Sequence, residues 1–97
     1  MNRILTAMVN EVAVMAELVE ADLKGQPGTS TYNNGSDAAG DVTVTIASVK
    51  LYGGAEAFSW KVEGEVEEWS GLADTVEVAT YAACMAAVAH IYADSSL

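Results

Sequence analysis

The chain has 97 residues, of which 52% are hydrophobic, and this length and apolar content suit a single folded domain with a core. Four basic residues against fourteen acidic ones give a net charge of −10 and a pI near 4.1. Because attraction to phosphate requires Lys and Arg, this balance argues against direct binding to nucleic acid or to an anionic membrane, and it favours a basic protein partner.

The first predicted element is a helix over residues 2–24. Its apolar residues follow i, i+3, i+4 spacing and form one wide stripe, and a second, weaker apolar line contains Val14 and Leu18. Gly25 and Pro27 form a stop signal at its end. One sheet would not need both apolar lines, so we expect the second line to contact either another helix or another copy of the protein.

A polar loop rich in Gly, Ser, Asn, Asp and Thr is predicted over residues 25–41. As an alternative to a plain loop, residues 29–32 form a short third strand at the edge of the sheet. A loop of this length in a compact domain is often a functional segment. Its acidic residues, Asp37 and Asp41, lack the ligand spacing of a calcium loop.

Two strands, 42–52 and 57–69, are predicted to pair as an antiparallel hairpin around a turn that contains two glycines. In the first strand the alternation of apolar and polar residues changes phase at Ala47-Ser48, which indicates either a β-bulge or a strand covered on both faces. Two strands alone are marginally stable, so helices must cover their apolar face, or a third strand or second chain must extend the sheet.

The segment 57–69 is the most clearly two-faced part of the chain. Its even positions hold the apolar residues Phe58, Trp60, Val62 and Val66. Its odd positions hold the polar residues Ser59, Lys61, Glu63, Glu65 and Glu67. Because successive side chains of a strand point to opposite faces, the pattern predicts one apolar strip and one acidic ridge, formed by Glu63, Glu65 and Glu67.

The acidic ridge is the only candidate working surface that the sequence offers. Glutamates at alternate strand positions lie about 6.6 Å apart and form a regular row of negative charge, to which Glu56 and Glu68 add at the ends. Such a row can imitate the phosphates of nucleic acid and bind a basic groove. The alternative is a solvated outer face that protects the sheet from edge pairing.

A second helix is predicted over residues 75–93, with Asp74 as its N-cap, after a strand break at Ser70-Gly71. No fixed charge occurs between residues 78 and 93, so the helix is apolar almost all round, as buried helices are. A small monomer can hardly surround such a helix. This favours a homodimer formed by helix packing; the alternative is that an alanine-rich face is exposed to solvent.

No pattern in the chain points to catalysis or to a bound metal or cofactor. His90, the only histidine, has only Asp94 at helical spacing to assist it, and it lacks both a nucleophile and companion ligands. Cys84, the only cysteine, lies among alanines, as a small buried side chain does. No segment resembles a membrane span or a signal peptide, so we expect a cytoplasmic protein.

The sequence therefore predicts a single α+β domain over residues 1–97, in the order α-β-β-α, with two helices packed on an antiparallel hairpin. In size, acidity and lack of catalytic residues the chain resembles the small acidic proteins with which phages block host defence, such as anti-CRISPR and DNA-mimic inhibitors. The resemblance is one of general character and covers no defined stretch of sequence.

Two functions follow from these observations. The first is a non-enzymatic inhibitor that binds a basic, nucleic-acid-binding protein, in the host cytoplasm if a phage encodes the chain, by charge mimicry. The acids expected to contact this partner are Glu56, Glu63, Glu65, Glu67 and Glu68. The second is an assembly module that self-associates through its helices.

Overall fold

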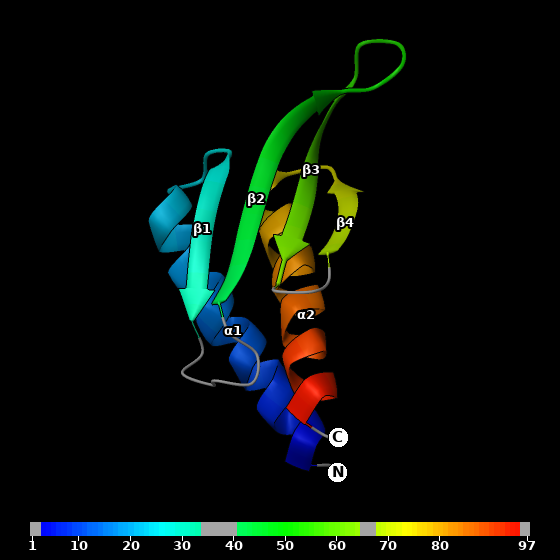
Figure 1. Ribbon diagram of the computed structural model, residues 1–97. Helices are drawn as coiled ribbons and strands as arrows, with labels where there is room; N and C mark the ends of the chain where they lie inside the picture. The colour runs from blue at the N-terminus through cyan, green and yellow to red at the C-terminus, as the bar shows by residue number, and fades with distance from the viewer. Residues whose placement is uncertain (1–2, 34–40, 65–67, 96–97) are drawn as a thin grey trace.

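The computed structural model describes residues 3–33, 41–64 and 68–95 of the chain (Figure 1). The helices are α1 (Arg3–Leu23) and α2 (Val76–Ser95), and the strands are β1 (Gly28–Asn33), β2 (Asp41–Lys50), β3 (Glu56–Glu63) and β4 (Glu68–Ala73). The predicted α+β class is confirmed, with both helices packed on an antiparallel sheet. The sheet has four strands, which makes the order α-β-β-β-β-α.

The four strands form one antiparallel sheet in the order β1-β2-β3-β4, so each strand pairs with its neighbour in the chain. β1 confirms the short strand considered for residues 29–32, and it pairs with β2 from Gly28↔Ile46 to Asn33↔Asp41. The hydroxyl of Tyr32 donates a hydrogen bond to a carboxylate oxygen of Glu11 on α1. This bond joins the edge strand to the helix behind it.

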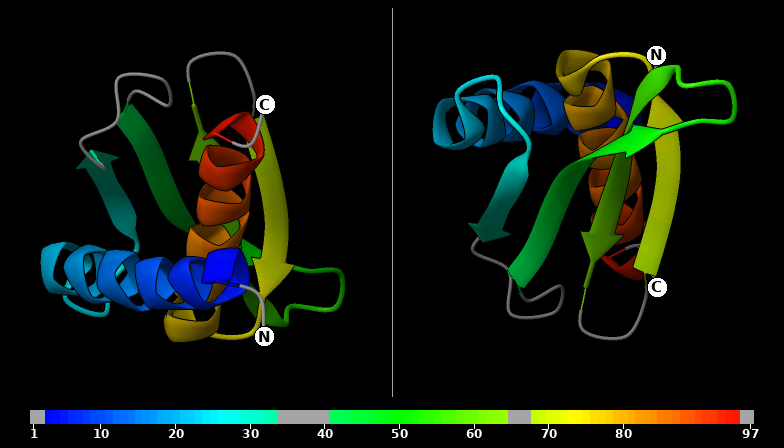
Figure 2. Two further views of the ribbon diagram at one scale, coloured as in Figure 1. Left: turned by 90° about the horizontal axis from the view of Figure 1, so that it is seen from below. Right: turned by 90° about the horizontal axis from the view of Figure 1, so that it is seen from above.

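The core lies between one face of the sheet and the two helices, which cross each other on that face (Figure 2). The sheet contributes the buried side chains of Val42, Val44, Ile46 and Val62. The helices contribute Met15, Ala16 and Val19 from α1, and Ala79, Ala83, Cys84, Ala87 and Val88 from α2. The small side chains of α2 allow its backbone to pack closely against the sheet.

The single strand predicted over residues 57–69 is wrong. β3 ends at Glu63, and β4 runs back beside it, so that Glu63 pairs with Glu68 and Phe58 with Ala73. Gly64, the one gap in the apolar alternation, lies directly after the end of β3. Glycine weakens the interior of a strand and accommodates a sharp change of direction, so this gap marked the end of the strand.

The strand break predicted at Ser70-Gly71 is also wrong, because both residues lie inside β4. Gly71 pairs with Trp60 of β3. A Cβ at Gly71 would lie 2.7 Å from three atoms of the indole ring. The glycine is therefore needed for the close approach of a ring, which is a common reason for glycine within a strand.

No bulge interrupts the pairing of β2 with β3, which runs in unbroken register from Thr43↔Glu63 to Lys50↔Glu56. The bulge predicted at Ala47-Ser48 is wrong, and the phase change has another cause. Pairing with β1 ends at Ile46 and pairing with β4 ends at Phe58. Beyond these points residues 47–57, which we call the arm, project past the rest of the sheet (Figure 1). Apart from Ala57, which is buried, and Val49, which is half-buried, the arm is exposed, so its residues need not alternate.

The backbone conformation after α1 and the capping residue before α2 set one end of each helix. α1 ends at Leu23, close to the predicted stop, where Lys24 and Gly25 both adopt positive φ. The N-cap of α2 is Thr75 rather than Asp74. Its Oγ1 accepts a hydrogen bond from the backbone N–H of Val78 at 3.1 Å. A cap must reach the N–H groups of the second or third helical residue, and Thr75 stands immediately before the first residue of α2.

Candidate interaction surfaces

Three of the five acids predicted to contact a partner lie among the described residues: Glu56, Glu63 and Glu68. Glu63 and Glu68 face each other across the β3–β4 pair, on the sheet face turned away from the helices. Glu56 begins β3 and is exposed, but an odd number of positions separates it from Glu63, so it belongs to the opposite face. Glu65 and Glu67 lie outside the described residues. The structure thus brings together two of the five acids.

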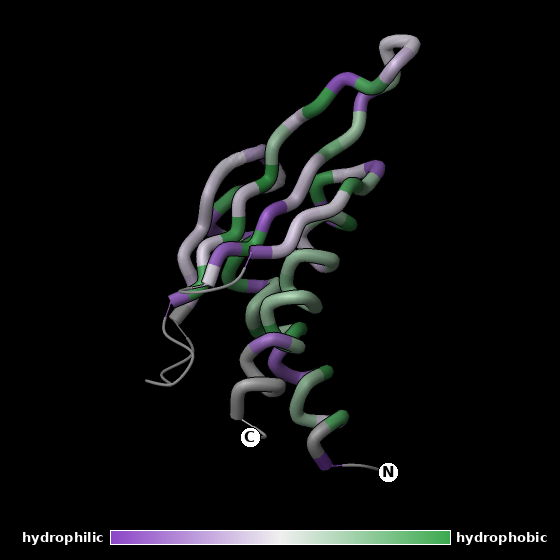
Figure 3. The backbone as a smooth tube through the Cα atoms, turned by 45° about the vertical axis from the view of Figure 1, so that its right-hand side comes forward, coloured by the Kyte–Doolittle hydropathy of each residue, from purple (hydrophilic) through white to green (hydrophobic). Residues whose placement is uncertain are grey.

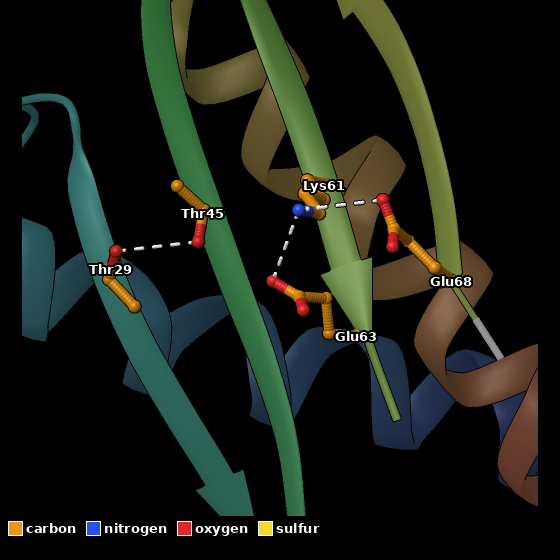
Figure 4. Close-up of polar contacts among 5 residues, drawn as sticks. All are labelled: Thr29, Thr45, Lys61, Glu63 and Glu68. Atoms are coloured by element: carbon orange, nitrogen blue, oxygen red, sulfur yellow. Dashed lines mark hydrogen bonds and ion pairs between the residues drawn. The ribbon is translucent and has the colours of Figure 1, made fainter. Parts of the chain in front are cut away.

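Lys61 lies between the two acids of the outer face. Its Nζ is 3.4 Å from Oε1 of Glu63 and 3.4 Å from Oε1 of Glu68 (Figure 4). The two carboxylates raise the pKa of Lys61, Glu63 more than Glu68. All three side chains are about half exposed, so water screens these ion pairs and each contributes little to stability. The positive charge of Lys61 offsets one of the two negative charges of Glu63 and Glu68.

The rest of the outer sheet face carries mostly small and hydroxyl side chains. The Oγ1 atoms of Thr29 and Thr45 lie 3.3 Å apart across β1 and β2 (Figure 4). Ser59 Oγ donates to the carbonyl oxygen of Ala47 at 3.5 Å. Leu72 of β4 is 60% exposed on this face. Among the described residues this face therefore combines hydroxyl groups, one ion-pair cluster and one exposed leucine.

The two helices form a second candidate surface. Seven large apolar side chains on the helices are 42–62% exposed. Two of them, Val14 and Leu18 of α1, form the second apolar line of that helix, which is therefore largely exposed. We call the other five the helical patch: Leu5 and Val9 of α1, and Val78, Tyr81 and Met85 of α2. Val9, Tyr81 and Met85 line a shallow hollow of about 270 Å³ between the helices. Val9 also lines an adjoining hollow of about 290 Å³ with Leu5. The patch is therefore continuous across both helices.

The orientation of α2 explains the patch. The helix turns small residues, such as Ala79, Ala83 and Ala87, toward the core and leaves Val78, Tyr81 and Met85 on the outside. It is hydrophobic along much of its length (Figure 3). In a helix that packs only against its own domain, the larger apolar side chains usually face inward. An exposed apolar patch is typical of an interaction surface.

His90 and Cys84 are both engaged in packing. The His90 ring lies on the indole of Trp69, with ring centroids 4.6 Å apart. Cys84 is fully buried, and burial, with a smaller contribution from Glu20, raises the pKa of its thiol to about 12. The thiol is therefore protonated at neutral pH, which makes it a poor nucleophile.

In the parts of the chain that the structure describes, no three His, Cys, Asp or Glu side chains gather as a metal-ligand set would. No helix among the described residues has the length and apolarity needed to cross a bilayer.

Sequence reasoning missed the arm. The phase change at Ala47-Ser48 signalled it, because a strand that leaves the core loses its alternation there.

Comparisons of the chain with protein-family models, curated proteins and solved structures found no match.

Proposed function

We propose that this protein is a non-enzymatic assembly module that self-associates through the helical patch. The orientation of α2 carries this proposal, because the helix leaves Val78, Tyr81 and Met85 exposed beside Val9 of α1. Burying such side chains against a second copy would remove apolar surface from water, which stabilises association by about 25 cal/mol per Å² before the costs of ordering.

The charge of the chain supports the choice of this surface. Two copies that each carry −10 repel one another, so they associate most readily where their contacting surfaces are uncharged. None of the five residues of the helical patch is an Asp, Glu, Lys, Arg or His. The outer sheet face, in contrast, carries Glu63 and Glu68.

Sedimentation tests this proposal with variants matched in chemistry but placed on opposite faces. We expect the wild type to associate at micromolar concentration and Val9→Glu and Met85→Glu each to shift it toward monomer. Leu72→Glu is the matched control, because Leu72 is equally exposed but lies on the outer sheet face. Circular dichroism checks that the variants fold. A wild type that is strictly monomeric, or equal effects of all three variants, contradicts the proposal.

A second proposal is a cytoplasmic inhibitor that binds a basic, nucleic-acid-binding protein by charge mimicry. The specific observation in its favour is the adjacent, exposed pair Glu63 and Glu68 on the face opposite the helical patch. A basic partner can compete with Lys61 for these carboxylates. The two proposals use different faces, so they can be tested separately.

Charge reversal at Glu63, Glu65 and Glu67 tests this second proposal. We expect these changes to abolish capture of basic nucleic-acid-binding proteins from a cytoplasmic extract while the fold survives. Three reversals at other exposed acids, Glu17→Lys, Asp22→Lys and Asp74→Lys together, control for the same change in net charge. Capture that is unchanged by the three reversals, or lost equally with the control, argues against charge mimicry at this site.

A further inference from the structure

The geometry points to the tip of the arm, Leu51 and Tyr52, as the segment that seats on the helical patch of a neighbouring copy. This inference rests on the self-association proposed above and identifies which part of the second copy covers the patch.

Most of the arm is neither paired with the outer strands of the sheet nor buried. The β1 edge of β2 is unpaired beyond Ile46, and the β4 edge of β3 is unpaired before Phe58. Figures 1 and 2 show the hairpin extending past the remaining strands. Residues 50–56 are all exposed. A two-stranded hairpin of this kind is marginally stable by itself, so the fold maintains an extension that its core does not use.

The tip presents apolar side chains from an ordered turn. Tyr52 is fully exposed and Leu51 is 42% exposed. The backbone N–H of Leu51 donates to the carbonyl oxygen of Ala55 at 2.7 Å, and that of Gly54 to the carbonyl oxygen of Leu51 at 3.0 Å. An ordered turn loses little conformational freedom on docking, and tyrosine is among the residues that most often dominate binding energy.

The tip and the helical patch match in charge. No Asp, Glu, Lys, Arg or His lies between Lys50 and Glu56, and none lines the hollow between the helices. Lys50, one of only four basic residues, directly precedes the tip, and it pairs across the strands with Glu56, so the base of the tip carries one charge of each sign. Glu17 and Glu77 each lie one helical turn from residues that line the hollow, so an incoming Lys50 would meet negative charge at its border.

A copy cannot place its own tip on its own patch. The tip lies at one end of the molecule, and the N-terminal part of α1, which carries Leu5 and Val9, lies at the other (Figure 1). The contact therefore joins two different surfaces of two copies. Such a head-to-tail contact leaves a free tip and a free patch, so it produces a ring if the rotation closes and a filament if it does not.

Site-specific cross-linking distinguishes this contact from a symmetric one. Ala55→Cys marks the tip and Ala13→Cys marks the hollow, and both positions are exposed and leave Leu51, Tyr52 and the helical patch intact. The native thiol of Cys84 is fully buried and does not compete for the reagent. With a short bismaleimide, we expect covalent dimers in a mixture of the two variants and not in either variant alone. A chain that carries both substitutions should give a ladder.

A second substitution checks that the tip itself makes the contact. Tyr52 has no support from its own chain, so Tyr52→Ala should leave the melting temperature of the monomer unchanged and weaken association at least about tenfold. The same change in the Ala55→Cys chain should abolish the cross-link, whereas Tyr52→Phe should retain it.

Three other outcomes distinguish docking of the arm from self-association through the helical patch. Cross-linking of Ala13→Cys with itself, and none with Ala55→Cys, overturns the role of the arm and supports patch-to-patch association. An associated wild type that gives no cross-link at all also overturns the role of the arm. A wild type that sediments as a monomer and gives no cross-link overturns both proposals.

Discussion

The contact of Gly71 with Trp60 allows a prediction that does not depend on function. In Gly71→Ala, the new Cβ lies 2.7 Å from Cε2, Cζ2 and Nε1 of the indole, which is too close for unbonded atoms. The φ of Gly71 is outside the left-handed region, so its backbone accepts alanine without strain. The indole is rigid and packs against the core, so it must move as a unit.

The cost of this movement can be bounded from two opposing effects. Overpacking a well-packed site costs about 1–3 kcal/mol, whereas replacing glycine by alanine stabilises by about 0.4–1 kcal/mol through the unfolded chain. The midpoints of these ranges, about 2 and about 0.7 kcal/mol, leave an expected net loss of about 1.3 kcal/mol in the free energy of unfolding. For a domain of this size, such a loss lowers the melting temperature by roughly 5–10 °C.

Thermal unfolding of the wild type, of Gly71→Ala, of Trp60→Leu and of the double variant tests this reasoning as a double-mutant cycle. Trp60→Leu removes the indole, so Gly71→Ala should be neutral or stabilising in that background. Tryptophan fluorescence of the single Gly71→Ala variant should report an altered environment for Trp60. A Gly71→Ala protein as stable as the wild type would refute the reasoning, and so would an equal loss in both backgrounds.

Three further predictions concern stability. Tyr32→Phe removes the hydrogen bond to the Glu11 carboxylate and should cost about 1.5–3 kcal/mol in urea unfolding; an unchanged midpoint argues that water replaces this bond. Thr75→Ala should cost about 1 kcal/mol and Asp74→Ala less, because only Thr75 caps α2; the reverse order would contradict the assigned cap. Burial raises the pKa of Cys84 from 9.0 to about 12, so the unfolded chain loses this proton first. The stabilisation is complete below pH 9 and lost toward pH 12, and the wild type should lose more stability over this window than Cys84→Ala.

Periodic patterns were sufficient to predict α1, β2 and the first part of β3, whereas α2 was predicted from its capping residues and its uninterrupted apolar run. The i, i+3, i+4 spacing in α1 and the β-branched alternation at Val42, Val44 and Ile46 each reflect burial on one face, which the sequence records directly. Strand ends were harder to place. Gly64 and Gly71 are both glycines in an alternating pattern, yet one follows a strand end and the other makes room for an indole. Only the position of Trp60 on the neighbouring strand distinguishes them.

The candidate surfaces could be predicted only in part. The sequence shows that α2 is apolar on nearly all sides, but the fit of its alanines against the sheet decides that Tyr81 and Met85 face outward. The acidic ridge assumed one strand over residues 57–69, whereas β3 ends at Glu63, and Glu65 and Glu67 lie outside the described residues. The ion pair of Lys61 with Glu63 was accessible from sequence, because residues two apart on a strand share a face.

The dependence of binding on salt separates the two proposed functions. Raising the salt concentration from about 0.01 M to about 1 M shortens the Debye length from about 30 Å to about 3 Å. Binding of a basic partner to Glu63 and Glu68 should weaken over this range, because it depends on attraction between exposed charges. Self-association through the helical patch should strengthen, because salt screens the repulsion between two copies that each carry −10. Sedimentation at both concentrations measures the second effect. Dissociation of the wild type at high salt would show that ion pairs, rather than apolar burial, hold the copies together.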